Sequence, residues 1–478
     1  MKSKYVTLAA AAGLCLAPFQ VPAQEINVSP DKNASMKVSI YNQNLALVKD
    51  TRQVELKDGT WSVAFEGVAQ QMQPETALLQ GEGVKVLEQN YEYDLLTPAN
   101  IIEESIGQKV KTVRVNPSNG DLIMEQAEIV NNNYGKPLLK MKYGVVDDFP
   151  GWVAFDSLPA NLRLKPTLVV KLENSQELKK DLTLNYLTGG LNWSANYVAE
   201  LGKDDTLDLQ GWVTLNNQSG ADYKNAEVQL VAGSVQAGST PVPMPVLPRA
   251  NLMMAKGMAA EATMDSASLP AQNLADYYLY TLPVKTDIMD KQSKQISLMN
   301  KPGVKYSRLY RLQSPLSLYW GNNDGEFERV RPSLVYKLVN NTKSNLGDPL
   351  PAGMVRFYEK DSSGNLQFTG AAELSQLAKG ETAELAVGEA FDLYAKGKVV
   401  NMQKLSDKMV ESEVEVTFHN AKNSEQTIEF EQSFPGSVEV VSESLESTKN
   451  KARSLKWEVS VPADGDTVLT FKVRVVRL

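Results

Sequence analysis

Alternation of apolar and polar side chains is the pattern that most constrains the fold of this chain. Val414, Val416 and Phe418 alternate with polar residues, and the segments 181–187 and 469–475 have the same two-residue period. Because successive side chains of a strand point to opposite faces, such a segment packs one face in a core and exposes the other. The sequence therefore predicts an all-β protein, with several immunoglobulin-like β-sandwich modules in series.

One segment has the pattern of a helix instead. In TPANIIEESIG, Thr97 suits the N-cap, Pro98 the first helical position and Gly107 the position beyond the last turn. Proline at the start and glycine past the end are typical of helices, because proline needs no N–H there and glycine accepts positive φ. We therefore expect one short helix.

Composition and turn signals divide the chain into regions. We expect an N-terminal β domain over 24–95, a short helix with a small β module over 96–160, a central β-sandwich region over 161–400 and a C-terminal immunoglobulin-like sandwich over 401–478.

Three segments of the chain resemble one another weakly. Asn216, Asn340 and Asn420 each stand where a predicted strand gives way to a polar turn. An asparagine amide can bond to nearby backbone and tolerates left-handed conformations, so it is suited to ending a strand. The three segments are either copies of one module or the chance similarity expected among many strands.

Residues 239–273 interrupt the strand pattern with many prolines, methionines and alanines and no aromatic residue. Closely spaced prolines exclude a central strand, and the segment has few side chains suited to a core. We predict a long flexible insertion. Clustered methionines can also form adaptable binding surfaces or copper sites. No histidine or cysteine accompanies them, so we predict neither a metal site nor a cofactor.

The N-terminus resembles a secretory signal peptide. Two lysines precede an apolar run at residues 6–16, and a small-residue pattern ends at Ala23. The run is shorter than the ~20 residues that span a membrane. We expect cleavage of residues 1–23 between Ala23 and Gln24, and a periplasmic or extracellular protein without a transmembrane segment. Lipidation at Cys15 is the alternative.

The mature chain is acidic and lacks cysteine. Residues 1–23 hold two lysines, no acid and the only cysteine, so residues 24–478 carry 47 basic and 57 acidic side chains, a net charge of −10. This balance argues against nucleic acid, whose phosphates attract basic surfaces. Without thiols the mature protein forms no disulfide, although it enters an oxidising compartment.

The common catalytic motifs are absent from the sequence, except for one SxxK pair, Ser29 to Lys32, which lies near the predicted mature N-terminus on an expected loose end. His419 is the only histidine, which excludes sites built on two histidines, and its place among polar positions of a strand indicates a surface residue. No serine-nucleophile elbow or phosphate-binding glycine loop is present. We predict no catalytic residue. A pair of carboxylates for glycan hydrolysis remains open, because the two acids can come from any two strands.

The stretch YLTGGLNWSANYVAEL concentrates glycine and aromatic residues. Gly189 and Gly190 break one predicted strand, and Trp193 and Tyr197 then fall on the same face of the next. Such aromatic residues pack against a facing sheet, and we expect Trp212 to brace the same hairpin region. We interpret the stretch as a structural corner. A sugar-stacking platform is the alternative.

An ordered run of motifs suggests a family. YLTGGLNWSANYVAEL, GWVTLNNQSGADYKNAEVQLVAG, LGDPLPAGMVRFYEKDSSGNLQFTG and GEAFDL resemble secreted bacterial proteins of the mucoidy inhibitor A type, whose shared module is domain of unknown function 4139. The resemblance runs from about residue 41 to the C-terminal strand. It implies an extracytoplasmic β-sandwich protein connected with the envelope or exopolysaccharide, and it implies no catalytic residue.

These observations favour a non-catalytic secreted or periplasmic protein that binds an envelope component, either a protein or a glycan. A glycan-acting hydrolase with paired carboxylates is the alternative function.

Overall fold

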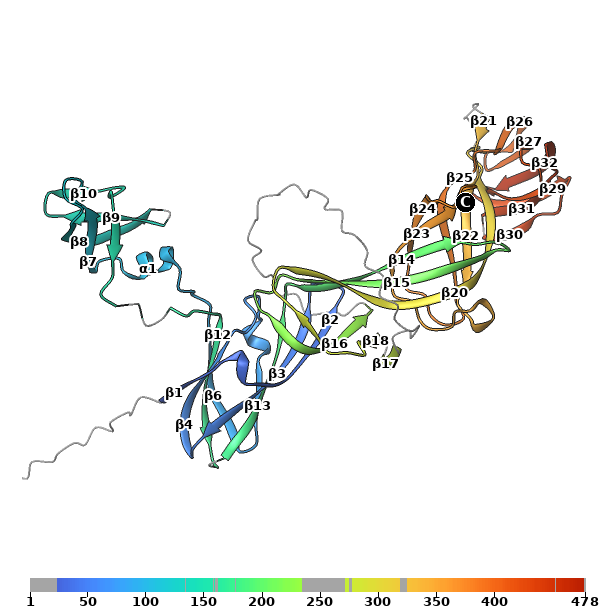
Figure 1. Cartoon of the computed structure of the whole chain (residues 1–478). Helices are drawn as coiled ribbons and strands as arrows, with labels where there is room; N and C mark the ends of the chain where they lie inside the picture. The colour runs from blue at the N-terminus through green and yellow to red at the C-terminus, as the bar shows by residue number, and fades with distance from the viewer. Residues whose placement is uncertain are drawn as a thin grey trace, which may run out of the picture. The chain divides into compact units, whose positions relative to one another are not determined.

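The computed structural model describes residues 24–133, 135–157, 159, 162–176, 178–233, 271–274, 277–318, 325–451 and 453–476 (Figure 1). The described chain is almost entirely strand, arranged in several sheets, with one α-helix. The predicted all-β class with serial β-sandwich modules and a short helix is therefore confirmed. The predicted signal peptide, including Ala23, lies outside the described residues, and so do all but residues 271–273 of the predicted insertion.

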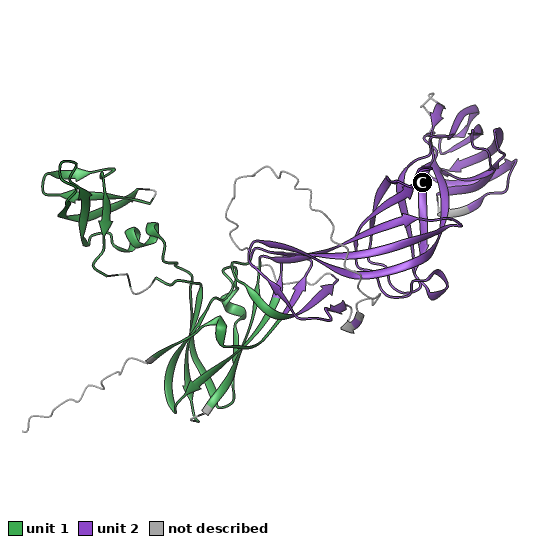
Figure 2. Ribbon diagram, viewed as in Figure 1, with its two compact units in different colours: residues 1–37, 47–189, 219–226 green, residues 38–46, 190–218, 227–478 purple. Residues whose placement is uncertain are grey.

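The chain divides into two compact units (Figure 2). Unit 1 comprises residues 1–37, 47–189 and 219–226, and unit 2 comprises residues 38–46, 190–218 and 227–478. Strands β2 (Asn33–Tyr41) and β16 (Tyr223–Ala232) are each divided between the units.

Unit 1 contains two sheets with a common core. The first has the order β1 (Gln24–Val28), β4 (Gly59–Glu66), β12 (Thr167–Asn174) and β6 (Val84–Glu92). The second includes β3 (Ala46–Leu56), β13 (Leu178–Thr188) and β5 (Leu78–Gln80). Phe65, Val170 and Leu184 are fully buried. Strand β13 alternates around Leu184, whereas β4 and β12 are buried at several successive residues around Phe65 and Val170. Arg52 is also buried, and its guanidinium pairs with Asp50 at 2.6 Å.

A small module of unit 1 contains the helix. Its sheet has the order β10 (Gly144–Val146), β9 (Lys136–Met141), β8 (Leu122–Asn133), β7 (Lys109–Val115) and β11 (Trp152–Ala154). Helix α1 (Pro98–Glu104) starts as predicted, since the Thr97 side chain accepts a hydrogen bond from the Asn100 N–H. Gly107 has φ +80°, which explains the glycine after the helix.

Unit 2 begins with three strands of one sheet and continues with a larger sheet. The first three are β17 (Ala271–Leu274), β18 (Tyr277–Thr281) and β16. The larger sheet has the order β24 (Leu366–Leu374), β23 (Gly353–Lys360), β14 (Leu191–Leu201), β15 (Thr206–Asn217), β20 (Gln292–Gln313), β28 (Gln426–Ser433), β31 (Ser454–Val461) and β30 (Thr448–Lys451). Strands β22 (Ser333–Val339) and β25 (Thr382–Glu389) branch from it.

Strand β20 connects two sandwiches of unit 2. Residues 292–305 pair with β15, residues 306–311 with β22, and residues 310–313 with β28. In the first sandwich Tyr336 of β22 packs on Phe357 of β23, with ring centroids 4.8 Å apart. One long strand therefore supplies side chains to both cores.

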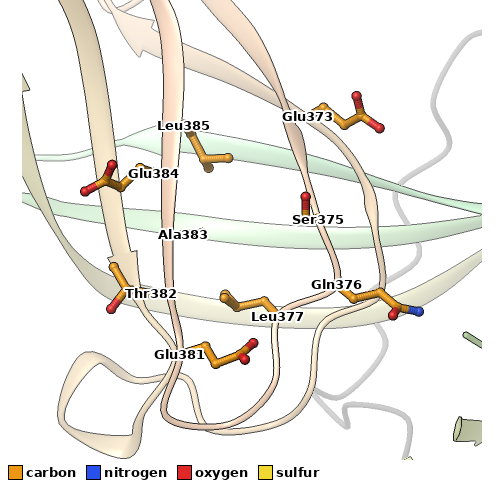
Figure 3. Close-up of a pocket in the computed structure, with 9 residues that line it drawn as sticks. All are labelled: Glu373, Ser375, Gln376, Leu377, Glu381, Thr382, Ala383, Glu384 and Leu385. Carbon is orange, nitrogen blue, oxygen red and sulfur yellow. The ribbon is translucent and has the colours of Figure 1, made fainter. Parts of the chain in front are cut away.

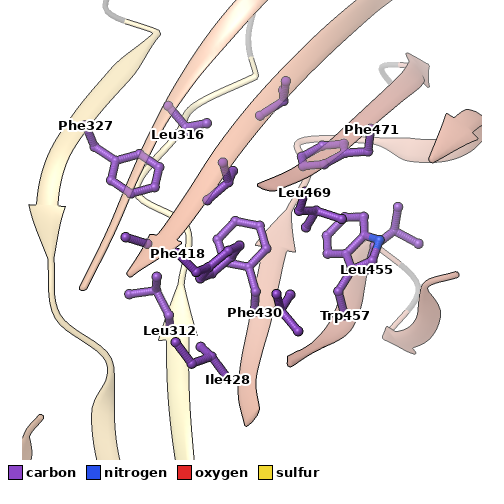
Figure 4. Close-up of a cluster of buried hydrophobic side chains, with 14 of the residues drawn as sticks. Leu312, Leu316, Phe327, Phe418, Ile428, Phe430, Leu455, Trp457, Leu469 and Phe471 are labelled. Carbon is purple, nitrogen blue, oxygen red and sulfur yellow. The ribbon is translucent and has the colours of Figure 1, made fainter. Parts of the chain in front are cut away.

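The second sandwich is C-terminal. Its other sheet has the order β21 (Glu326–Val330), β26 (Leu393–Ser406), β27 (Met409–Asn420), β32 (Gly465–Val476) and β29 (Ser437–Glu443). The remaining elements are β19 (Thr286–Ile288) and the 3₁₀ turns η1 (Pro30–Lys32), η2 (Pro74–Thr76) and η3 (Thr342–Ser344). Figure 4 shows the core of this C-terminal sandwich. There Trp457 stacks on Phe471, with ring centroids 4.6 Å apart, and Phe430 meets Phe418 edge to face.

Buried asparagines end two strands of unit 2, as their sequence positions suggested. The Asn340 amide nitrogen lies 2.9–3.2 Å from three carbonyl oxygens. The Asn420 amide nitrogen also lies 2.9–3.1 Å from three carbonyl oxygens. In the third segment the buried residue is Asn217, whose amide donates to the Ile288 carbonyl, and not Asn216. The choice of Asn216 was wrong by one residue, because strand β15 keeps its alternation one position further.

Candidate functional site

The glycine pair stands at a break between strands. Strand β13 ends at Thr188 and β14 begins at Leu191, so Gly189 and Gly190 separate them. Gly190 has φ +80°, a conformation that side chains disfavour. Its N–H donates to the Asn44 side chain at 3.0 Å, and its carbonyl accepts from the Gln218 N–H. These bonds hold the start of hairpin β14–β15.

The two aromatic residues of β14 point into the core of unit 2. Trp193 is 4% exposed, and its indole N–H donates to the Val231 carbonyl at 3.3 Å. Its ring meets Tyr280 edge to face, with centroids 6.5 Å apart. The Tyr197 hydroxyl donates to the Pro351 carbonyl at 2.8 Å, and burial is the main cause that raises the pKa of this hydroxyl. Both side chains hold neighbouring segments in place.

Trp212 lies on the opposite face of the hairpin. It pairs with Asn196, whereas Tyr197 pairs with Gly211, so the two aromatic residues point to opposite sides. Any Cβ at position 211 would lie 3.3 Å from the Tyr197 ring and 2.7 Å from Met299. The glycine therefore makes room for the Tyr197 ring. Trp212, on the other face, is 38% exposed.

The segments held by Tyr197 and Trp193 border a small cavity. Tyr278, Tyr280 and the prolines at 349 and 351 line it on one side, and residues 376–378 line it on the other. The volume is about 210 Å³. Backbone bonds between Leu350 and Leu377 join the two sides at 2.9 and 3.0 Å. The aromatic core of β14 thus supports the wall of a surface cavity.

A larger cavity of about 440 Å³ adjoins it, with Gln376, Leu377 and Glu381 lining both (Figure 3). It lies where β24 runs through the loop 375–381 into β25. Its lining is mainly hydrogen-bonding, with carboxylate, hydroxyl and amide groups, which are those of Glu373, Glu381, Glu384, Ser375, Thr382 and Gln376. We call this cavity, with these lining residues, the β24–β25 cavity.

Two of the cavity carboxylates already have strong partners. Glu384 accepts a hydrogen bond from Arg311 at 2.8 Å, and this bond is the main cause that lowers the pKa of Glu384. Arg311 also binds Glu429 at 2.9 Å. Glu381 accepts from the Ala378 N–H at 2.7 Å, which stabilises the loop. The cavity can therefore accept and donate hydrogen bonds, whereas Glu384 is held as a carboxylate.

The other described residues singled out from the sequence do not line this cavity. Gln24 is the first residue of β1, and Ala23 is outside the described residues. The His419 ring contacts Asp466 at 2.6 Å and packs on Tyr394. Among the residues that the structure describes, no three His, Cys, Asp or Glu side chains are grouped as a metal site. Within the same residues, no helix is long and apolar enough to cross a bilayer.

Sequence reasoning did not find the β24–β25 cavity. Its residues come from a polar loop and two strand ends, and no motif distinguishes them from other turns. The available signal was the pair of motifs LGDPLPAGMVRFY and GEAFDL on either side of the loop.

The fold and the cavity define a class: a multi-module β-sandwich protein whose larger unit carries a polar surface cavity. A family model described as "Domain of unknown function (DUF4139)" matches residues 182–476, and the chain belongs to this family. The match includes both glycines, Trp193, Tyr197 and the whole cavity. No curated protein matches the chain.

Proposed function

We propose that the protein is an exported, non-catalytic binding protein of the cell envelope, which holds a polar ligand in the β24–β25 cavity. The supporting observation is the cavity lining, where Ser375, Thr382 and Gln376 present hydroxyl and amide groups while Glu384 and Glu381 are engaged by Arg311 and the loop backbone. Concave sites with a few convergent polar groups are typical of ligand binding.

Export and family type belong to the same proposal. The N-terminal pattern ending at Ala23 supports secretion to the periplasm or the exterior, and the absence of cysteine from residues 24–478 is consistent with that route. The motif run supports kinship with secreted proteins of the mucoidy inhibitor A type.

Glycan hydrolysis is the alternative. A glycosidase needs one carboxyl with a raised pKa as general acid and a second carboxylate as base or nucleophile. The lowered pKa of Glu384 argues against its use as the acid. Glu373 and Glu381 are the remaining carboxyls of the cavity, and Glu381 is engaged by the Ala378 N–H, so Glu373 is the candidate for that role.

The test measures retention of the mature chain, residues 24–478, on isolated cell envelopes. Ser375→Phe places a bulky ring in the cavity, and Ser363→Phe places the same ring in the exposed hairpin between β23 and β24 as a matched control. We expect the Ser375 variant to lose about tenfold or more in affinity, equivalent to ~1.4 kcal/mol, and the control to bind normally. Equal retention of both variants would exclude the cavity as the site.

A second measurement addresses catalysis. Reducing-end assays on envelope glycans should give no product with the purified chain. Product that forms and disappears in Glu373→Gln would establish the hydrolase in place of the binding protein.

A further inference from the structure

The outward face of the large sheet of unit 2 is unusual in composition. Strand pairing aligns Glu373, Met354, Asn196, Trp212 and Ser297 in one row across β24, β23, β14, β15 and β20. Directly paired residues point to the same side of a sheet. The alternate residues of these strands, such as Val355 and Val213, are buried in the core. The row is therefore on the solvent side.

Two further rows extend this surface. The second aligns Ala371, Arg356, Val198, Gln210 and Asn300, and the third aligns Phe368, Tyr358, Glu200 and Asp208. Leu366 pairs with Lys360 beyond them. We call these residues the outer face.

The outer face exposes large apolar side chains. Phe368 is 60% exposed, Leu366 52%, and Met354 and Trp212 38% each. The solvated face of an antiparallel sheet is ordinarily polar, and neighbouring exposed apolar groups commonly mark binding sites. Phe368 packs edge to face on Tyr358, with centroids 5.6 Å apart. The face thus has an aromatic pair on β23 and β24 and a separate indole on β15.

Its charges nearly balance, because Lys360 and Arg356 stand beside the carboxylates of Glu200, Asp208 and Glu373. Lys360 pairs with Glu200, and Arg356 donates to the Asn196 side chain at 3.2 Å. The Asp208 carboxylate accepts a hydrogen bond from the Gly303 N–H at 2.8 Å. A polyanion would need a basic surface, and this face has none. The partner should therefore carry little net charge.

The spacing suits an extended ligand. Trp212 and Phe368 are three strands apart, roughly 14 Å at ~4.8 Å per strand, and four residues apart along the strands, roughly 13 Å at ~3.3 Å per residue. The diagonal between the two positions is therefore about 20 Å. Between them lie the amides and guanidinium of Asn196, Gln210 and Arg356. Sugar rings present C–H groups on their faces, which pack on aromatic rings, and hydroxyls at their edges, which bond to amides and guanidinium groups.

We propose that the outer face binds a neutral glycan chain, with sugar rings packed on Trp212 and on the Tyr358–Phe368 pair and hydroxyls bonded to Asn196, Gln210 and Arg356. Glu373 belongs to both the outer face and the β24–β25 cavity, so a bound chain can reach the cavity. The inference names a ligand class that the proposed function leaves open, and it rests on different side chains.

The test is affinity electrophoresis of residues 24–478 through gels containing dextran, mannan, a β-1,3-glucan or a soluble β-1,4-glucan, with polygalacturonate as the anionic comparison. We expect at least one neutral polymer to retard the protein and polygalacturonate to leave it unretarded. Trp212→Ala with Phe368→Ala should lower the affinity about tenfold or more, a loss of ~1.4 kcal/mol or greater. Phe391→Ala removes a ring that is 79% exposed away from the outer face, and it should bind normally.

Two further variants separate the possible failures. Trp212→Tyr keeps an aromatic ring and should retain most of the affinity, which shows that a loss in Trp212→Ala is not misfolding. Ser375→Phe should leave retardation by the neutral polymer in place if the outer face is the glycan site. If Ser375→Phe loses envelope binding while no polysaccharide retards the native chain, the cavity is supported as the binding site and the glycan inference is overturned.

Other results also overturn the inference. These are equal retardation of the native chain and the double variant, retardation by polygalacturonate alone, and photocrosslinking from position 212 to an envelope protein in place of glycan.

Discussion

Replacing Trp193 with alanine tests how far hairpin β14–β15 determines the stability of unit 2. The indole is 4% exposed and donates to the Val231 carbonyl, so alanine leaves a cavity and removes this hydrogen bond. Large-to-small changes of a buried tryptophan cost about 3–5 kcal/mol. Trp193→Phe keeps most of the packing and loses only the N–H donor, so it should cost about 1 kcal/mol beyond the small volume change.

The assay must resolve one module, because a chain with several modules does not unfold in a single two-state transition. Native-state hydrogen exchange of peptides from β14 and β15 reports the local free energy of opening, and peptides from the C-terminal sandwich serve as an internal reference. Phe391→Ala, at an exposed ring, is the matched control and should change stability by about 0.5 kcal/mol or less. A loss under about 1 kcal/mol in Trp193→Ala would refute the structural role of this residue.

Three other changes are expected to have measurable effects. Arg52→Met should lower the free energy of opening of β3, measured by hydrogen exchange, by about 3–5 kcal/mol, because it leaves the Asp50 carboxylate buried without the guanidinium. Adding Asp50→Leu should recover much of the loss, and losses that simply add in the double variant would contradict this coupling. Burial, followed by the neighbouring Tyr93, raises the pKa of Tyr91 to about 12. The phenol of the unfolded chain titrates near pH 10, so the stability that this group contributes is fully present below pH ~10 and is lost as the pH rises to ~12. Difference absorbance at alkaline pH will check the titration, and unfolding curves over the same pH range will check the stability. Mass spectrometry of the exported protein should find Gln24 as the first residue, whereas an acylated Cys15 would show a lipoprotein. Reductant should leave the melting temperature unchanged in thermal unfolding.

The sequence predicted those features that depend on neighbouring residues. Period-two alternation was sufficient for the all-β class, because the two faces of a strand meet different surroundings wherever it lies. The helix was predicted from Thr97, Pro98 and Gly107, because caps act within one turn. Asn340 and Asn420 were recognised as ends of strands for a similar local reason. Asn216 was chosen in place of Asn217, because only the burial of β15 shows which amide points inward.

The tertiary structure alone decided that Trp212 lies on the opposite side of the sheet from Trp193 and Tyr197, and which strands are neighbours. Trp193 and Trp212 are similar in sequence context, yet one is in the core and the other on the outer face, because the register of β14 with β15 opposes Trp212 to Asn196. The row from Glu373 to Ser297 joins residues far apart in the chain through a parallel pairing of β14 with β23. Such pairings follow from burial summed over the whole sandwich, which no local pattern contains. The β24–β25 cavity and the outer face therefore became visible only once the sheet order was known.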